Sequence, residues 1–68
     1  MDWVAREAAM KINYQEFFRL RRAGVRGWVV IQRGKLMGND STEEGAFIKA
    51  GLNPEYRYED CLVVRVAK

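Results

Sequence analysis

The stretch from Gly27 to Gly38, GWVVIQRGKLMG, decides the fold, because it contains two short apolar segments separated by Arg33 and Gly34. β-Branched and aromatic residues favour extended backbone. Arg-Gly is a suitable two-residue connection, since glycine readily adopts the positive φ that tight hairpin turns require. The stretch therefore predicts an antiparallel β-hairpin.

This hairpin has apolar side chains on both of its faces. With a two-residue turn, Ile31 faces Leu36 and Val30 faces Met37 across the two strands. One face then carries Trp28, Val30 and Met37, and the other carries Val29, Ile31 and Leu36. A hairpin with one solvated face alternates polar and apolar residues, so we expect this one to be covered on both sides.

A helical region precedes the hairpin. Asn13 stands three residues ahead of Glu16, which is the spacing of an N-cap and its capping-box partner. Residues 2–23 therefore form either one long helix or two short helices that meet near Asn13, and Gly24 ends the region in both cases. Apolar residues at helical spacing form its core-facing stripe: Trp3, Met10, Tyr14, Phe17 and Leu20.

A second helix and a third strand follow the hairpin. Residues Ser41–Glu44 read S-x-x-E, a capping box, and Gly51 is the predicted C-cap. Gly45 inside this helix costs about 1 kcal/mol relative to alanine, so we expect close packing there. Cys61–Val66 is an apolar, valine-rich run that predicts the last strand.

The predicted fold is a single α+β domain over residues 1–68. Its order is an N-terminal helical region, a β-hairpin, one helix and a third strand, which together form a small antiparallel sheet in the order 2-1-3.

In this order the chain resembles a small prokaryotic domain family of unknown function, with a W-V-A-[IV]-x-x-G-K hairpin, a Ser-x-Glu-Glu helix and a valine-rich last strand. The resemblance covers residues 14–66, and residues 1–12 lie outside it as an N-terminal extension helix. It implies the fold and no catalytic residues. The matching residues are Phe17, Phe18, Trp28–Ile31, Gly34, Lys35, Ser41, Glu43, Glu44 and Leu62–Val66.

Length and composition favour association with another molecule. A chain of 68 residues buries only about 60% of its unfolded surface, so its stability margin is thin. One cysteine cannot form an internal disulfide. Without histidine, a zinc site would have to be built from one thiolate and carboxylates, which is a poor ligand set. We therefore expect no metal and no cofactor, and either a protein partner or self-association.

The N-terminus has an acid at its second position and no apolar run of the length that a signal peptide or a membrane span needs. A single unpaired thiol suits a reducing compartment. The sequence therefore predicts a cytoplasmic protein that makes no membrane contact.

The sequence contains few candidate catalytic residues. The carboxylates of Asp40, Glu43 and Glu44 fit helix capping. Those of residues 55–60 fit a solvated loop before a strand, and Cys61 has no histidine to activate it. We predict that the protein is not an enzyme and has no catalytic residues.

Protein association is the first functional hypothesis, because a small core and a hairpin that is apolar on both faces suit a module that docks on a larger assembly. The alternative is that the chain's own helical regions cover both faces. The predicted protein-binding residues are Trp28, Met37, Tyr56 and Tyr58.

Nucleic-acid binding is the second hypothesis. Six basic residues and no acids lie between Arg19 and Lys35. The N-terminal region resembles a helix-turn-helix whose recognition helix starts at Asn13, with the hairpin as a wing. Six acids between Gly38 and Asp60 would repel phosphate. The residues predicted to contact nucleic acid are Arg19, Arg22, Arg26, Arg33 and Lys35.

Overall fold

The structure, a computed structural model, describes residues 3–67 as two helices and three strands. The side chains of residues 3–6 and 9 lie outside this description, and with them the predicted role of Trp3 in the apolar stripe. The strands form one antiparallel sheet in the order β2-β1-β3, which confirms the predicted α+β class and strand order. The elements are α1 (Trp3–Arg22), β1 (Gly27–Gln32), β2 (Lys35–Asp40), α2 (Glu43–Lys49) and β3 (Cys61–Val66).

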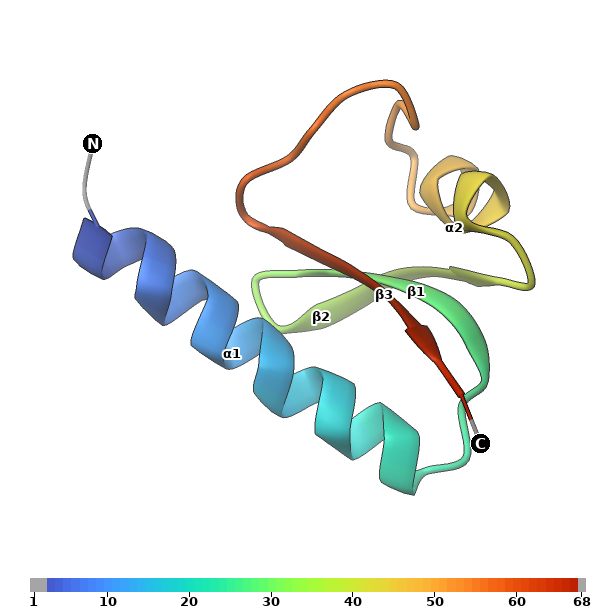
Figure 1. Cartoon of the computed structure of the whole chain (residues 1–68), viewed down its shortest axis with the longest axis horizontal. Coiled ribbons are helices and arrows are strands. Elements are labelled where there is room, and N and C mark those ends of the chain that lie inside the picture. Colours follow the sequence, from blue (N-terminus) through green and yellow to red (C-terminus); the bar gives the residue numbers. More distant parts are fainter. Residues whose placement is uncertain (1–2, 68) are drawn as a thin grey trace.

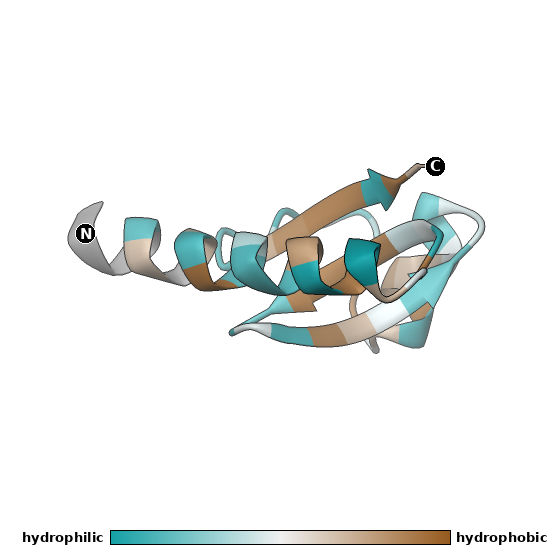
Figure 2. Ribbon diagram, turned by 90° about the horizontal axis from the view of Figure 1, so that it is seen from below, coloured by the Kyte–Doolittle hydropathy of each residue, from teal (hydrophilic) through white to brown (hydrophobic). Residues whose placement is uncertain are grey.

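The two helices cover opposite faces of the sheet, so that the molecule has three layers (Figure 1). Seen from below, α1 crosses one face lengthwise (Figure 2). The expected cover on both faces of the hairpin is thus confirmed, and the chain's own helices provide it. The α1-side core contains Leu20, Val29, Ile31, Leu62 and Val66, and the α2-side core contains Val30, Ala46, Phe47 and Cys61.

Helix α1 is continuous, so of the two alternatives for the N-terminal region the single long helix is correct. Asn13 is not an N-cap: it lies in the middle of α1 and is fully buried. Gly24, with φ +89°, follows the helix end as predicted. In the described part of the chain, no helix is both long and apolar enough to cross a membrane.

Helix α2 begins one residue later than predicted. Its N-cap is Thr42 rather than Ser41, and the Thr42 hydroxyl accepts a hydrogen bond from the Gly45 N–H at 3.0 Å. Asp40 favours Thr42 over Ser41 as the N-cap, because the Asp40 carboxylate accepts hydrogen bonds from both the backbone N–H and the hydroxyl of Thr42. The C-cap is Ala50, and Gly51, the predicted C-cap, is the residue after it, with φ +75°.

The hairpin register changes in the middle of β2. Ile31 faces Leu36 as predicted, but Val30 faces Gly38 and not Met37, which is the extra residue of a β-bulge. The physical reason is the contact with α2: a Cβ on residue 38 would lie 2.8 Å from the backbone nitrogen of Ala50. Only glycine lets β2 approach the helix this closely, so the bulge places Gly38 beneath α2.

Candidate interaction surface along strand β3

The sheet has two edges, and they differ in how they are protected. Edge strand β2 carries the bulge at Met37 and an exposed lysine, Lys35. Bulges and edge lysines are devices that prevent strands of other molecules from pairing. Strand β3 runs in unbroken register with β1, from Cys61 to Val66, and Arg65 is its only charged residue. The β3 edge therefore has no bulge, and its one charged side chain, Arg65, lies near its end.

The hairpin turn shows which backbone groups of β1 point toward β3. Arg33 and Gly34 have φ values of +55° and +75°, as in a two-residue type I′ turn. In such a turn the flanking residues, here Gln32 and Lys35, are a hydrogen-bonded pair. The hydrogen-bonding groups alternate along a strand, so those of Ile31 point the other way, toward β3.

The same alternation continues across β3. Ile31 faces Leu62, so the N–H and C=O groups of Leu62 and Val64 bond to β1, whereas those of Val63 and Arg65 point away from the sheet. The Cys61 N–H also points away, because it donates to the Tyr58 carbonyl at 3.2 Å. The outer edge of β3 thus presents a row of backbone donors and acceptors.

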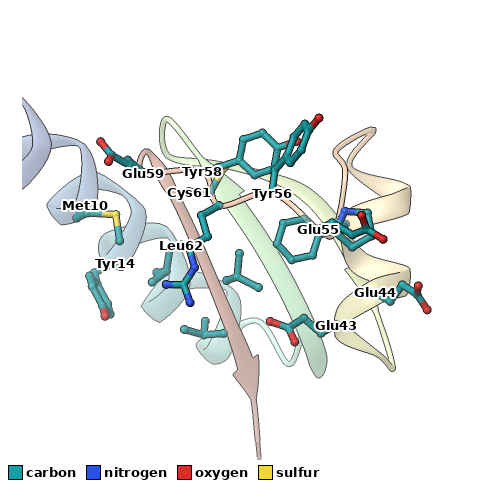
Figure 3. Close-up of a pocket in the computed structure, with 15 residues that line it drawn as sticks. Met10, Tyr14, Glu43, Glu44, Glu55, Tyr56, Tyr58, Glu59, Cys61 and Leu62 are labelled. Atoms are coloured by element: carbon teal, nitrogen blue, oxygen red, sulfur yellow. The ribbon is translucent and has the colours of Figure 1, made fainter.

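A groove runs along this edge between the two helices (Figure 3). Met10 and Tyr14 of α1 line one side of it, and Glu43 of α2, whose carboxylate points toward β3, lines the other. The loop between α2 and β3 closes one end. An added strand beside β3 would lie in this groove.

The loop contributes two tyrosines to the groove. The Tyr58 ring packs on Phe47 with 6.3 Å between ring centroids, and its hydroxyl accepts a hydrogen bond from the Asn53 N–H at 3.0 Å. These contacts hold the Tyr58 side chain in place against α2 and the start of the loop. The Tyr56 ring lies 6.4 Å from that of Tyr58 and is 64% exposed, so it is available for contact.

The structure brings together only two of the four predicted protein-binding residues. Tyr56 and Tyr58 line the groove. Trp28 is half-buried against the α2-side core, and Met37 is exposed on the opposite edge strand. Trp28 therefore contributes to the core, and Met37 lies away from the groove.

Sequence reasoning missed two aromatic residues on α1. Tyr14 and Phe18 are 45% and 46% exposed, although Tyr14 was expected to face the core. Their spacing of four residues puts them on one flank of the helix, on the side of the groove that Tyr14 lines. The buried residues Asn13 and Leu20 define a core-facing line on α1 that is offset from both aromatics, and the burial of Asn13 could not be read from the sequence.

The five basic residues predicted to contact nucleic acid lie at two places, the end of α1 and the hairpin turn. Arg19 forms an ion pair with Glu16 at 2.6 Å, and this hydrogen bond lowers the pKa of Glu16. Arg26 donates to the neighbouring Val25 carbonyl. Arg33 lies in the hairpin turn and Lys35 follows it, beside the middle of α1, whereas Arg22 ends that helix. Nine residues of helix, or about 14 Å, separate Asn13 at the turn from Arg22.

The helix-turn-helix interpretation is wrong, because α1 continues through the proposed turn without interruption. The predicted recognition helix is the second half of α1, and its first residue, Asn13, is buried. Nucleic-acid binding by the basic residues stays a prediction without this structural support.

The carboxylates near residue 40 have structural contacts. Asp40 forms an ion pair with Lys49 at 2.9 Å. Its pKa is lowered first by the hydrogen bond from Lys49 and then by those from Thr42. Asp60 accepts a hydrogen bond from Gln32 at 3.0 Å. Among the described residues, no group of three or more histidine, cysteine, aspartate or glutamate side chains could hold a metal ion.

Cys61 packs as a small apolar residue in the α2-side core, as predicted. Burial, followed by the nearby Asp60 charge, raises the pKa of its thiol to about 11. At about pH 8 only about one thiol in a thousand would be ionised, and the thiolate is the reactive form. We expect slow alkylation by iodoacetamide in the native protein and fast alkylation in denaturant. Equal rates in both conditions would show that the thiol is not held in the core.

Comparison of the chain with protein-family models, curated proteins and solved structures found no match. The resemblance to the small prokaryotic domain family stays a prediction.

Proposed function

We propose that the chain is a non-enzymatic protein-interaction module that binds an extended segment of a protein along the outer edge of β3. In this mode, called β-strand addition, backbone hydrogen bonds supply affinity and side-chain contacts supply specificity. The observation that carries the proposal is the regular outer edge of β3, which is free of bulges and apolar from Cys61 to Val64. The opposite edge, by contrast, carries a bulge.

The groove supports the same proposal, because its walls suit a strand with side chains on both sides. A strand added to β3 would direct alternate side chains toward α1 and toward α2. On the α1 side they would meet Met10 and Tyr14, and on the other side Tyr56 and Tyr58. Tyrosines with apolar rings and polar hydroxyls are common in protein interfaces.

Proline at residue 63 tests the backbone contact. Proline has no N–H, and it is tolerated where an edge-strand N–H points outward. We expect Val63→Pro to remain folded and to weaken binding by about tenfold or more, since one hydrogen bond is lost and the proline ring obstructs the added strand. Val63→Ala is the matched control, because it shortens the same side chain and keeps the N–H.

The probes are peptides of about 12 residues selected from a random library on the immobilised wild-type chain. Their affinities for wild type, Val63→Ala and Val63→Pro are then measured by fluorescence polarisation. Only every second N–H of a bound peptide faces β3. N-methylation of either the odd-numbered or the even-numbered peptide residues should therefore abolish binding, and N-methylation of the other set should not. Binders that are indifferent to both changes would contradict the proposal, and so would a library that yields no binders for a monomeric chain.

A further inference from the structure

We infer that the extended segment bound along β3 is β3 of a second copy of this chain, paired antiparallel. Two three-stranded sheets would then form one six-stranded sheet. The inference rests on the proposed function, because it names the occupant of the same edge. A two-fold axis perpendicular to the sheet relates the two copies, so each contributes an identical surface.

The backbone pattern of β3 defines the register. When the two strands are centred on Val63, this residue pairs with Val63 of the second copy, and Cys61 pairs with Arg65 of the second copy. Val63 and Arg65 have both backbone groups on the outer edge, and such residues form the hydrogen-bonded pairs of an antiparallel ladder. The Cys61 N–H already donates to the Tyr58 carbonyl, so Cys61 contributes only its C=O, as acceptor for the Arg65 N–H of the second copy.

The exposed aromatic residues of α1 supply a second contact. A two-fold axis perpendicular to the sheet keeps both α1 helices on the same face, and turns the flanks on the β3 side toward each other. Tyr14 and Phe18 lie on that flank and are 45% and 46% exposed. Strand pairing alone makes a small interface. Burial of these rings between the two α1 helices would add apolar area to that interface and so stabilise the dimer.

The charges at the two ends of β3 are complementary in this arrangement. The strand is preceded by the acids Glu59 and Asp60 and carries the basic Arg65 near its end. Antiparallel pairing places Arg65 of one copy beside the acidic end of the other, and the two-fold repeats the contact. Opposite charges at such positions favour the antiparallel register over a parallel one, in which like charges would meet.

Sedimentation equilibrium tests the dimer over about a hundredfold range of protein concentration. We expect reversible dimers for wild type and Val63→Ala, and a dimer affinity about a hundredfold or more weaker for Val63→Pro. A wild-type chain that is monomeric over the whole range would overturn the inference. So would a folded Val63→Pro variant that dimerises like Val63→Ala.

If Val63→Pro fails to fold, as judged by circular dichroism, a pair of surface variants of α1 decides the matter. Phe18→Glu puts a charge on the flank at the proposed interface and should abolish dimers. Ile12→Glu is the control, because Ile12 is 48% exposed and packs near Gly34 at the hairpin turn, on the other flank. Dimers that survive Phe18→Glu, or that are lost equally in both variants, would contradict the arrangement.

Cross-linking locates the interface directly. In a Cys61→Ala background, Val63→Cys should form covalent dimers with a short bismaleimide, whereas Met37→Cys on the opposite edge should not. Preferential cross-linking at Met37→Cys would overturn the inference. A monomeric chain whose selected peptides bind through Val63 would overturn the inference alone, and a monomeric chain that yields no such peptides would overturn the proposed function as well.

Discussion

Gly38→Ala is expected to lower the melting temperature by more than about 12 °C, or to leave α2 detached from the sheet. The new Cβ would lie 2.8 Å from the Ala50 backbone nitrogen and even closer to the Ala46 carbonyl oxygen. Both atoms belong to the backbone of α2, so no side-chain rotation relieves the contact and the helix has to move. Overpacking of this kind costs about 3 kcal/mol, and more where the structure cannot yield.

Backbone conformation does not explain the requirement for glycine here, because Gly38 is not among the glycines with positive φ. Gly24→Ala is therefore the informative control: its φ is +89°, and nothing lies within 4 Å of the added Cβ. That variant should lose only about 1 to 2 kcal/mol through backbone strain. Thermal unfolding followed by circular dichroism compares the two, and a Gly38→Ala melting temperature near that of wild type would refute the close contact.

Asn13→Ala is expected to cost about 2 to 5 kcal/mol of unfolding free energy. The buried amide joins three segments: its Nδ2 donates to the Asp60 carbonyl at 2.9 Å, and its Oδ1 accepts from the Gly34 N–H at 2.8 Å. Truncation leaves both backbone groups without a partner in the interior. A chain of this size has a total stability of about 3 to 10 kcal/mol, so the variant should lose a large part of its stability.

The control for Asn13→Ala is Gln15→Ala, which removes an exposed amide from the same helix and should change stability by less than about 0.5 kcal/mol. Urea denaturation followed by circular dichroism measures both variants. An Asn13→Ala midpoint equal to that of Gln15→Ala would show that the amide does not connect α1 to the hairpin turn and to β3.

The elements predicted correctly are those whose signals are local. The hairpin follows from β-branched residues around Arg33 and Gly34, and the helix ends follow from Gly24 and Gly51. The N-cap of α2 was misplaced because Ser41 and Thr42 are both good capping residues. The choice between them is made by Asp40, whose carboxylate binds Thr42.

Other features depend on tertiary contacts that no local pattern contains. Asn13 is spaced from Glu16 as an N-cap would be. Its buried position instead depends on hydrogen bonds to Asp60 and Gly34, which are distant in the sequence. The bulge at Met37 arises because α2 packs on the residue that follows it. Of the candidate surface, the sequence indicated the loop tyrosines but not the aromatics of α1, whose exposure depends on how the helix is rotated against the sheet.

The pairing of β1 with both of its neighbours also sets the order in which the sheet can assemble. The turn between β1 and β2 spans only Arg33 and Gly34, whereas the Gln32–Cys61 pair closes a loop that contains all of α2. Closing the longer loop has the larger entropic cost, and its contacts form only after that cost is met. We therefore expect β2 to pair with β1 earlier in folding than β3 does. Binding along its outer edge would hold it in place, and so would couple association to the completion of folding.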